Sequence, residues 1–353
     1  MSPHVTDHGA VASATAPPLA MGLVGAGRMG AFHARTLAQR LPGVRLAAVA
    51  DPAPGAARAL ADELGCPTAL TDIDRLFSDP GIDAVVIATP ARTHADLVVA
   101  AARAGKAVYC EKPMAVSLAD ADRAIDAARE AGVQLQVGFN RRYDAGFRAA
   151  RARIDAGAVG TPQLLRSLTR DPNLADPARI PQWTIFLETL IHDFDTLRFL
   201  NPGAEPVEVC AMADALVRPD FRDRGLLDTA VVTIRFDNGA LATAEASFQA
   251  VYGYDVRGEV FGSGGMLTMG DARRTHLTSY GPDGISADCV TYDQDLFHDA
   301  YVAELADFTD SVRSGRATAV TGEDARAALA IALASVHSVT TGGPVRLDAL
   351  KDA

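Results

Sequence analysis

MGLVGAGRMG, residues 21–30, is the stretch that decides the fold of this chain. Its apolar beginning predicts a strand and the residues after it predict a helix, so the order is strand, glycine turn and helix. In a dinucleotide site, Gly25 allows the tight turn, Gly27 lets the backbone approach a pyrophosphate and Gly30 lets the helix pack on the strand. The helix N-terminus then faces the phosphates. The glycines alone also fit an ordinary turn, so the assignment depends on its surroundings.

A second predicted strand, residues 46–50, supports the dinucleotide interpretation because it ends at an acidic residue. Asp51 follows the glycines by about 20 residues, where a carboxylate accepts hydrogen bonds from ribose hydroxyls, and this favours NAD. Neither Ala53 nor Pro54 could bind a 2'-phosphate, which makes NADP the less favoured cofactor. An ordinary turn aspartate before Pro52 is the alternative.

Length and composition indicate a globular protein with two domains. The chain has 353 residues, more than one core usually supports, and its net charge is -11. Because Lys and Arg are scattered, nucleic acid is not an expected partner. Four widely spaced cysteines form neither a disulfide framework nor a zinc motif. Residues 1–18 resemble a disordered tail and not a signal peptide, and no apolar stretch is long enough to span a membrane, so we expect a cytoplasmic protein.

The hydrophobic pattern divides the chain in two. Over residues 19–138, short apolar strands alternate with alanine-rich helical segments, which predicts an α/β domain with a parallel sheet. Residues 139–353 predict a second, α+β domain for substrate binding and oligomerisation, built on an open, mostly antiparallel sheet. The expected strands lie near 21–25, 45–50, 83–88, 107–110, 133–137, 163–169, 207–213, 230–236, 241–249 and 254–261, with strands dominating until about 280, and the expected helices of the second domain near 143–156, 184–200, 296–314 and 322–340.

Loops at the carboxyl ends of parallel strands are where ligands of such sheets bind. Two loops of this kind are expected at residues 89–94 and 110–113. In the second loop, Lys112 follows a predicted strand and precedes Pro113, which restricts the lysine backbone. A lysine there would stand beside a bound nicotinamide; a solvated loop lysine is the alternative.

Glu188 and His192 are four residues apart in a predicted helix, so they share one helical face. A histidine can take a hydroxyl proton near neutral pH, and a neighbouring carboxylate would orient its ring. An ordinary salt link within the helix is the alternative. A metal site at His192, Asp193 and Asp195 is a third interpretation, which the spacing disfavours because the two aspartates do not share a helical face.

These motifs together resemble the glucose-fructose oxidoreductase, inositol dehydrogenase and MocA family (Gfo/Idh/MocA), and within it the inositol 2-dehydrogenases. The resemblance covers residues 21–347. It implies a Rossmann domain, NAD-linked oxidation of a ring hydroxyl of a myo-inositol-like cyclitol to a ketone, and a homo-oligomer, either a tetramer or a dimer. It rests on GAGRMG (25–30), Asp51, ATP (88–90) with His94, EKP (111–113), GFNRRYD (138–144), IHDFD (191–195) and YGYD (252–255).

The resemblance implies catalytic roles for Lys112 and His192, with Glu188 as the accompanying carboxylate. Glu188 stands where the family usually has Asp, and Trp183-Thr184 replaces a small Gly-Gly segment. This departure leaves the polyol open among inositols, aminocyclitols, other cyclitols and pyranose sugars. The candidates for binding the cofactor are Gly25, Gly27, Arg28, Met29, Gly30, Asp51, Thr89, Pro90, His94, Glu111 and Lys112. The candidates for binding the substrate are Lys112, Arg142, Asp171, Glu188, His192, Tyr252 and Tyr254.

Two other functions fit the same features. A reductase that makes a cyclitol or sugar in a biosynthetic pathway would use the same residues in the opposite direction. A non-catalytic NAD-binding sensor would need neither a base nor a lysine, and the presence of both Lys112 and His192 argues against it.

Overall fold

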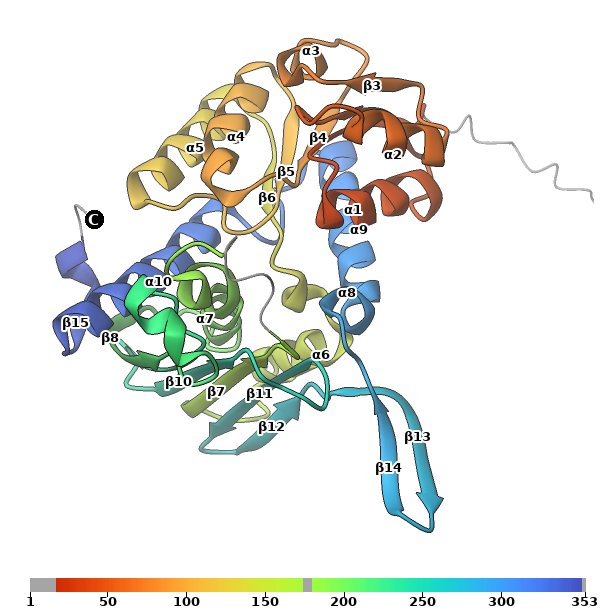
Figure 1. Ribbon diagram of the computed structural model, residues 1–353. Coiled ribbons are helices and arrows are strands. Elements are labelled where there is room, and N and C mark those ends of the chain that lie inside the picture. Colours follow the sequence, from red (N-terminus) through yellow and green to blue (C-terminus); the bar gives the residue numbers. More distant parts are fainter. Residues whose placement is uncertain (1–16, 174–179, 351–353) are drawn as a thin grey trace, which may run out of the picture.

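The computed structural model describes residues 17–173 and 180–350, and its N-terminal part forms the predicted parallel sheet (Figure 1). The strand order is β3-β2-β1-β4-β5-β6, and all neighbouring strands are parallel. The order reverses between β1 and β4, which is where open α/β sheets bind ligands. The sequence pattern does not indicate β3, because this strand is only three residues long and half-buried. The strands are β1 (Leu19–Val24), β2 (Val44–Ala50), β3 (Thr68–Leu70), β4 (Ala84–Ile87), β5 (Ala107–Cys110) and β6 (Leu135–Val137).

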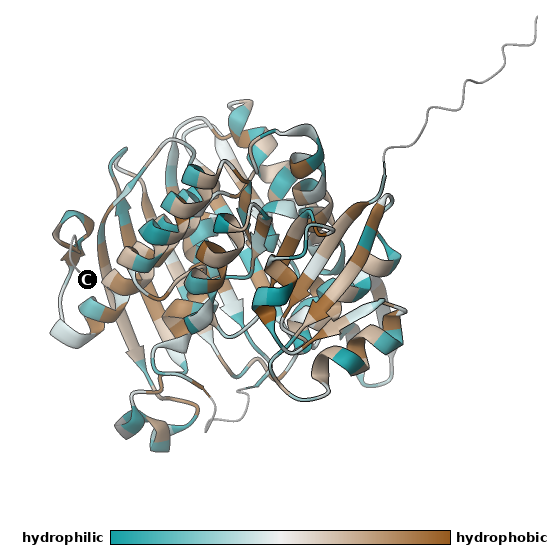
Figure 2. Cartoon of the chain, turned by 90° about the horizontal axis from the view of Figure 1, so that it is seen from above, coloured by the Kyte–Doolittle hydropathy of each residue, from teal (hydrophilic) through white to brown (hydrophobic). Residues whose placement is uncertain are grey.

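Helices cover both faces of the parallel sheet, so its strands are apolar on both sides, and they are largely brown in Figure 2. Met21 of β1 enters one hydrophobic core and Val24 enters the other. Local sequence sets the helix ends: Ser117 accepts a hydrogen bond at the start of α5, and Gly132 ends this helix in the left-handed conformation. The helices are α1 (Arg28–Gln39), α2 (Ala56–Leu64), α3 (Ile73–Phe77), η1 (Ala91–Thr93), α4 (His94–Arg103) and α5 (Leu118–Ala131).

The second sheet has seven strands in the order β12-β11-β7-β10-β9-β8-β15. β10 and β7 are parallel and the other neighbours are antiparallel, which confirms the predicted mostly antiparallel sheet. β12 falls in the stretch up to about residue 280 where strands are expected to dominate, whereas the sequence pattern does not indicate β15. The strands are β7 (Pro162–Arg170), β8 (Pro206–Asp214), β9 (Thr229–Phe236), β10 (Leu241–Ser247), β11 (Asp255–Gly262), β12 (Gly265–Met269) and β15 (Val345–Arg346).

Helices α7 and α10 pack on one face of this second sheet, and the other face is open. Side chains alternate along β9 between buried and exposed, as a sheet covered on one side requires. A separate hairpin of β13 (Arg273–Gly281) and β14 (Gly284–Cys289) projects from the body of the molecule (Figure 1). The remaining helices are η2 (Asn140–Tyr143), α6 (Ala145–Asp155), α7 (Leu190–Phe199), η5 (Pro219–Arg224), α8 (Asp293–Leu296), α9 (His298–Ser314), α10 (Gly322–Thr341) and η6 (Leu347–Leu350).

The helix that the sequence predicts over residues 184–200 is divided in the structure. Ile185–Thr189 form a π-helical turn, η4, and only α7 after it is α-helical. Trp183 precedes the turn with φ 63°, a left-handed backbone conformation that a bulky residue rarely adopts. Such turns and strained residues occur frequently at functional sites. The helical spacing on which the pairing of Glu188 with His192 depends is therefore altered.

Helix α9 returns from the second half of the chain to the parallel sheet. Its Leu305 and Phe308 are fully buried in the same core as Met21 and Tyr109. The two halves therefore share packed core residues and do not meet only at a surface. Among the helices of the described ranges, none has the length and apolar character needed to cross a membrane.

Candidate active site

A cavity of about 470 Å³ lies where the parallel sheet meets the helices and strands of the second half. Arg28 and Met29, at the start of α1, line it from one side. Five further sequence-predicted residues from both halves also line it, so the fold brings together candidates that are far apart in the chain. These residues are Lys112, Asp171, Glu188, His192 and Tyr254.

Lys112 is fixed at both its main chain and its side chain. Its main-chain N–H donates to Glu111 Oε2 over 3.2 Å, and its Nζ donates to the main-chain carbonyl of Glu188 over 2.9 Å. The lysine therefore bridges the loop after β5 and the π-helical turn. From the sequence we expect the Glu188 carboxylate to orient Lys112 or His192, or to bind a neighbouring hydroxyl of the substrate. The contact with Lys112 comes from the Glu188 peptide carbonyl, while residue 188 also lines the cavity.

His192, at the start of α7, lines the cavity opposite the parallel sheet. Burial, together with the charges of Lys112 and Arg141, lowers the pKa of His192 well below its usual value. The imidazole is therefore neutral near pH 7 and able to accept a proton. Phe139 packs edge-on against the ring at 5.9 Å, and the buried Nδ1 has no hydrogen-bond partner among the described residues.

Asp171 and Tyr254 are polar side chains that both line the cavity. Burial, and then the charge of Asp293, raise the pKa of Asp171 to about 6. The charges of Lys112 and Arg141 act in the opposite direction. At neutral pH, Asp171 is therefore mostly ionised and can accept hydrogen bonds from ligand hydroxyls.

Sequence reasoning misses Arg141, which lines the cavity next to Asn140. Arg141 is buried, and its guanidinium donates to Asp193 Oδ1 over 2.8 Å and to Thr169 Oγ1 over 2.6 Å. Asp193 also accepts from Ser167 and Thr169. The two acidic residues spaced two apart in α7 are the signal that could have indicated a partner for each of two adjacent arginines.

Arg142 and Tyr252, both candidates for binding substrate hydroxyls, do not line this cavity. Arg142 points the other way from its neighbour and forms a bidentate pair with Asp195, at 2.6 and 2.8 Å. Tyr252 is 47% exposed, and its hydroxyl donates to Asp255 Oδ2 over 2.7 Å. Adjacent residues in the short η2 helix project in different directions, so Arg141 takes the place in the cavity that the sequence assigns to Arg142.

The glycine turn has the shape that a dinucleotide requires. A Cβ at Gly25 would crowd the carbonyl of Ala88, and one at Gly30 would overlap the carbonyl of Gly25. A Cβ at Gly27 would meet nothing within 4 Å, so the backbone there is open to close approach. No side chain caps the N-terminus of α1 and no acidic residue lies in its first turn. These residues therefore fit a bound pyrophosphate.

Asp51 lies at the carboxyl end of β2, beside the glycine turn. Its Oδ2 accepts from the main-chain N–H of Ala26 over 2.7 Å, and its Oδ1 accepts from Ala53. The carboxylate thus reaches the turn itself, in the position where a ribose would be held. Thr89 and Pro90 follow β4 at the same edge, where the Thr89 and Thr93 hydroxyls are 2.8 Å apart.

His94 and Glu111 are buried behind the cavity instead of lining it. The His94 ring nitrogens lie 2.7 Å from the carbonyl of Thr89 and 2.8 Å from that of Pro113. The histidine thereby ties the loop after β4 to the loop after β5. Glu111 contacts His33 and the main chain of Lys112. His94 and Glu111 therefore support the loops at the nucleotide edge but do not line the cavity themselves.

The aspartates of the alternative metal site are engaged elsewhere. Asp193 is paired with Arg141 and Asp195 with Arg142. Within the described ranges, the one group of metal-ligating side chains close enough to share an ion is His33, Glu111 and Glu304, which does not include His192.

Comparison with known proteins assigns the chain to a family. Residues 19–139 match the family model described as "Oxidoreductase family, NAD-binding Rossmann fold", and residues 147–268 match the GFO/IDH/MocA C-terminal domain. The chain is 40% identical to scyllo-inositol 2-dehydrogenase (NAD(+)) of Bacillus subtilis over 92% of this chain and 95% of that protein. It is 38% identical to myo-inositol 2-dehydrogenase of Thermotoga maritima over 93% and 98%, respectively.

A solved structure extends the likeness to the whole fold. The scyllo-inositol dehydrogenase of Lactobacillus casei, crystallised with NAD(H) and scyllo-inositol, superimposes with a TM-score of 0.90 at 27% identity, covering 94% of this chain and 99% of that one. The protein therefore belongs to the GFO/IDH/MocA family of oxidoreductases, with an NAD-binding Rossmann fold.

Proposed function

We propose that this protein oxidises a ring hydroxyl of an inositol-like cyclitol to a ketone with NAD. One observation carries the proposal: Lys112 and His192, from different halves of the chain, line a single cavity together with the first residues of α1. That arrangement places a cation and a neutral base beside the nucleotide edge. The names of the relatives, scyllo- and myo-inositol 2-dehydrogenases, indicate the class of substrate.

In the proposed reaction, His192 takes the proton of the hydroxyl, because its lowered pKa keeps the ring neutral. Lys112 donates a hydrogen bond to the same oxygen and stabilises the negative charge that develops there. The carbonyl of Glu188 and the Glu111 carboxylate hold the lysine in place for this task. NAD, when bound along Gly25, Gly27 and Gly30 with its ribose at Asp51, supplies the acceptor for the hydride.

The other hydroxyls of the ring would meet charged and polar side chains on the cavity wall. Asp171 can accept hydrogen bonds, Arg141 can donate them, and Tyr254 and Glu188 can contribute further polar contacts. A cavity of about 470 Å³ has room for a monocyclic polyol beside a nicotinamide. A wall that offers both donors and acceptors suits a molecule that carries a hydroxyl on every ring carbon.

We further propose that copies of the chain associate through the open face of the second sheet, as a dimer or tetramer. Three large apolar side chains on adjacent strands are neighbours there: Leu241 pairs with Leu164, and Leu164 pairs with Phe261. All three are more than 40% exposed in the single chain. Light scattering after gel filtration tests this association, and L164E should lower the measured mass.

We also propose a cytoplasmic location for the protein, because the described cysteines are free and the proposed reaction uses NAD.

The test of the function is an absorbance assay at 340 nm with a panel of inositols, aminocyclitols and hexoses, run with NAD and with NADP. We expect the highest rate with an inositol and NAD. K112A and H192A should each lower the turnover number by about 10² to 10⁴-fold. H298A, a partly exposed histidine of α9 outside the cavity, serves as the matched control and should retain wild-type turnover.

Two results would contradict the proposal. The mechanism is wrong if both K112A and H192A keep near wild-type turnover with the best polyol. Tight dinucleotide binding without an absorbance change for any polyol would instead favour the non-catalytic NAD-binding sensor.

A further inference from the structure

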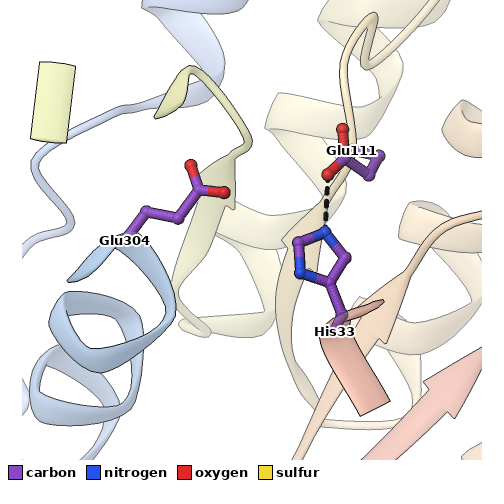
Figure 3. Close-up of side chains that lie close together, drawn as sticks. All are labelled: His33, Glu111 and Glu304. Carbon is purple, nitrogen blue, oxygen red and sulfur yellow. Dashed lines mark hydrogen bonds and ion pairs between the residues drawn. The ribbon is translucent and has the colours of Figure 1, made fainter. Parts of the chain in front are cut away.

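Directly behind Lys112 lies a buried cluster of three ionisable side chains that do not line the cavity (Figure 3). His33 belongs to α1, the helix that begins at the glycine turn, and Glu111 follows β5. Glu304 comes from α9, which returns from the second half of the chain. His33 and Glu304 are 0% exposed and Glu111 is 6% exposed.

The Glu111 carboxylate connects the dinucleotide helix to the lysine. Its Oε1 lies 2.6 Å from His33 Nε2, and its Oε2 accepts from the main-chain N–H of Lys112 over 3.2 Å. A carboxylate can only accept hydrogen bonds, so Nε2 of His33 is the donor. His33 is six residues after Gly27 on the same helix. One carboxyl group thus links the helix that would hold the pyrophosphate to the backbone of the residue that would contact the substrate.

The charges in the cluster favour this link. Burial raises the pKa of Glu111, but the hydrogen bond with His33 and the charged groups around it, His33 and Lys112 among them, together hold the pKa below its ordinary value. Glu304 has the opposite character, because burial and the charge of Glu111 raise its pKa well above the usual range. Tyr109 donates to Glu304 Oε1 over 2.5 Å. The negative charge therefore resides on Glu111, the member that contacts Lys112.

The third member completes the surroundings of the pair. Ligand atoms of the three side chains lie within 4.8 Å of one another, and Figure 3 shows the Glu304 carboxyl group directed toward the His33 ring, with a hydrogen bond drawn only between His33 and Glu111. Nε2 of His33 is engaged by Glu111, and its buried Nδ1 has no hydrogen-bond partner among the described residues. The hydrogen bond within the cluster therefore joins His33 to Glu111, the member that contacts Lys112.

We propose that His33 and Glu111 are positioning residues that set Lys112 relative to the dinucleotide-binding helix α1. Hydrogen bonds to a buried, ionised carboxylate are stronger than those between neutral groups and hold a narrow range of geometries. A shift of α1 when the dinucleotide binds would pass through His33 and Glu111 to Lys112. The inference rests on the proposed function only for the role of Lys112 in the reaction.

The chain offers a direct probe of this link because it contains three lysines, Lys106, Lys112 and Lys351. Full-length protein labelled with ¹⁵N-lysine therefore gives three amide signals. The Lys112 amide is the group that donates a hydrogen bond to the Glu111 carboxylate. We expect H33L to increase the hydrogen-exchange rate of this amide about tenfold and to weaken the response of its signal to NADH. The turnover number with inositol should fall by about 10 to 100-fold, with little change in the KM for inositol.

Matched variants separate positioning from general damage. H33Q keeps a donor near the position of Nε2 and should restore turnover to within about threefold of wild type. Y109F removes the bond to Glu304 in the same cluster but leaves the contacts of Glu111, so Lys112 should behave as in wild type. The Lys106 side chain donates to the main-chain carbonyls of Asp79 and Ile82. The amide signal of Lys106 therefore reports whether the fold is intact. If H33L does not fold, E111Q supplies the test. Glutamine has one acceptor oxygen where glutamate has two, so it cannot accept from His33 and from the Lys112 amide through separate oxygens.

The proposal is overturned if H33L and E111Q leave the Lys112 amide and the turnover number as in wild type, or if Y109F perturbs them as strongly. Failure of the proposed function looks different. Wild-type protein would then oxidise no polyol, while the exchange of the Lys112 amide would still depend on His33.

Discussion

The two walls of the cavity hold their functional groups by different means. On the parallel-sheet wall, Lys112 is fixed through its main chain and one peptide carbonyl, with the supporting side chains buried behind it. On the opposite wall, Asp171, His192 and Tyr254 face the cavity with their own side chains, and burial shifts the pKa of each. The first wall carries the glycine turn and Asp51, which fit a dinucleotide. The second wall carries the side chains that would meet the substrate, and its Glu188 carbonyl is the acceptor that holds the Lys112 Nζ.

The largest effect should come from Arg141, which lines the cavity and pairs with the buried Asp193. R141M leaves Asp193 buried without its charged partner, which should lower the free energy of unfolding by about 3–5 kcal/mol. The KM for the polyol should also rise, because Arg141 lines the cavity. Chemical denaturation and steady-state kinetics measure the two effects.

R142M is the matched control for this prediction. R142M leaves the buried Asp195 without its charged partner, so the free energy of unfolding should fall. Because Arg142 lies outside the cavity, the KM for the polyol should not change. Equal KM values for R141M and R142M would show that Arg141 has only a structural role.

The next largest effect concerns the nucleotide side of the first wall. D51A removes the carboxylate that accepts a hydrogen bond from the glycine turn and that would accept hydrogen bonds from the ribose. A hydrogen bond to a charged group contributes about 1.5–3 kcal/mol. We expect the Kd for NAD to rise about tenfold or more and the preference for NAD over NADP to narrow. Fluorescence titration with NADH and NADPH measures this. D51N, which retains an acceptor oxygen, should lie between wild type and D51A, and unchanged NAD affinity in D51A would place the ribose elsewhere.

A smaller effect should appear in the pH dependence of the second wall. The pKa of Asp171 is raised to about 6, so its carboxylate accepts hydrogen bonds above this pH and becomes protonated below it. The value of kcat/KM for the polyol should therefore fall about tenfold per pH unit below pH 6 if the carboxylate is required. D171N should be less active at pH 8 and should lack this limb, leaving only the limb of His192 at lower pH, since the His192 pKa is lowered well below its usual value. A limb near pH 6 that persists in D171N would assign it to another group.

The smallest effect tests a support that lies behind the second wall. Thr321 caps α10 and forms a reciprocal capping box with Asp324. T321A should lower the free energy of unfolding by about 1 kcal/mol without altering turnover, because the cap is outside the cavity. S117A, at the cap of α5 on the other sheet, offers a comparison of similar size. A large loss of activity in T321A would mean that α10 controls the geometry of the site.

The sequence predicts the first wall better than the second. The glycine turn, Asp51 and Lys112 each sit directly after a strand, so the order of strand and loop is enough to place them at one edge. His192 and Glu188 are predicted on one helical face, and both line the cavity, but the π-helical turn makes a peptide carbonyl, not a carboxylate, the partner of Lys112. Arg141 and Arg142 are adjacent and chemically identical, so only their three-dimensional partners distinguish them.

The sequence by itself determines the parallel sheet, the position of the nucleotide edge, the mostly antiparallel second sheet and the choice of Lys112 and His192 as candidates, both of which line the cavity. These depend on periodicity and on short motifs, which act through neighbours in the chain. Tertiary structure alone decides which arginine lines the cavity, that α9 packs into the core of the other half, and that His33 lies against Glu111. The ion pair of Arg141 joins residues 52 positions apart and the contact of His33 joins residues 78 positions apart. Their energies depend on burial and partners that no local pattern records.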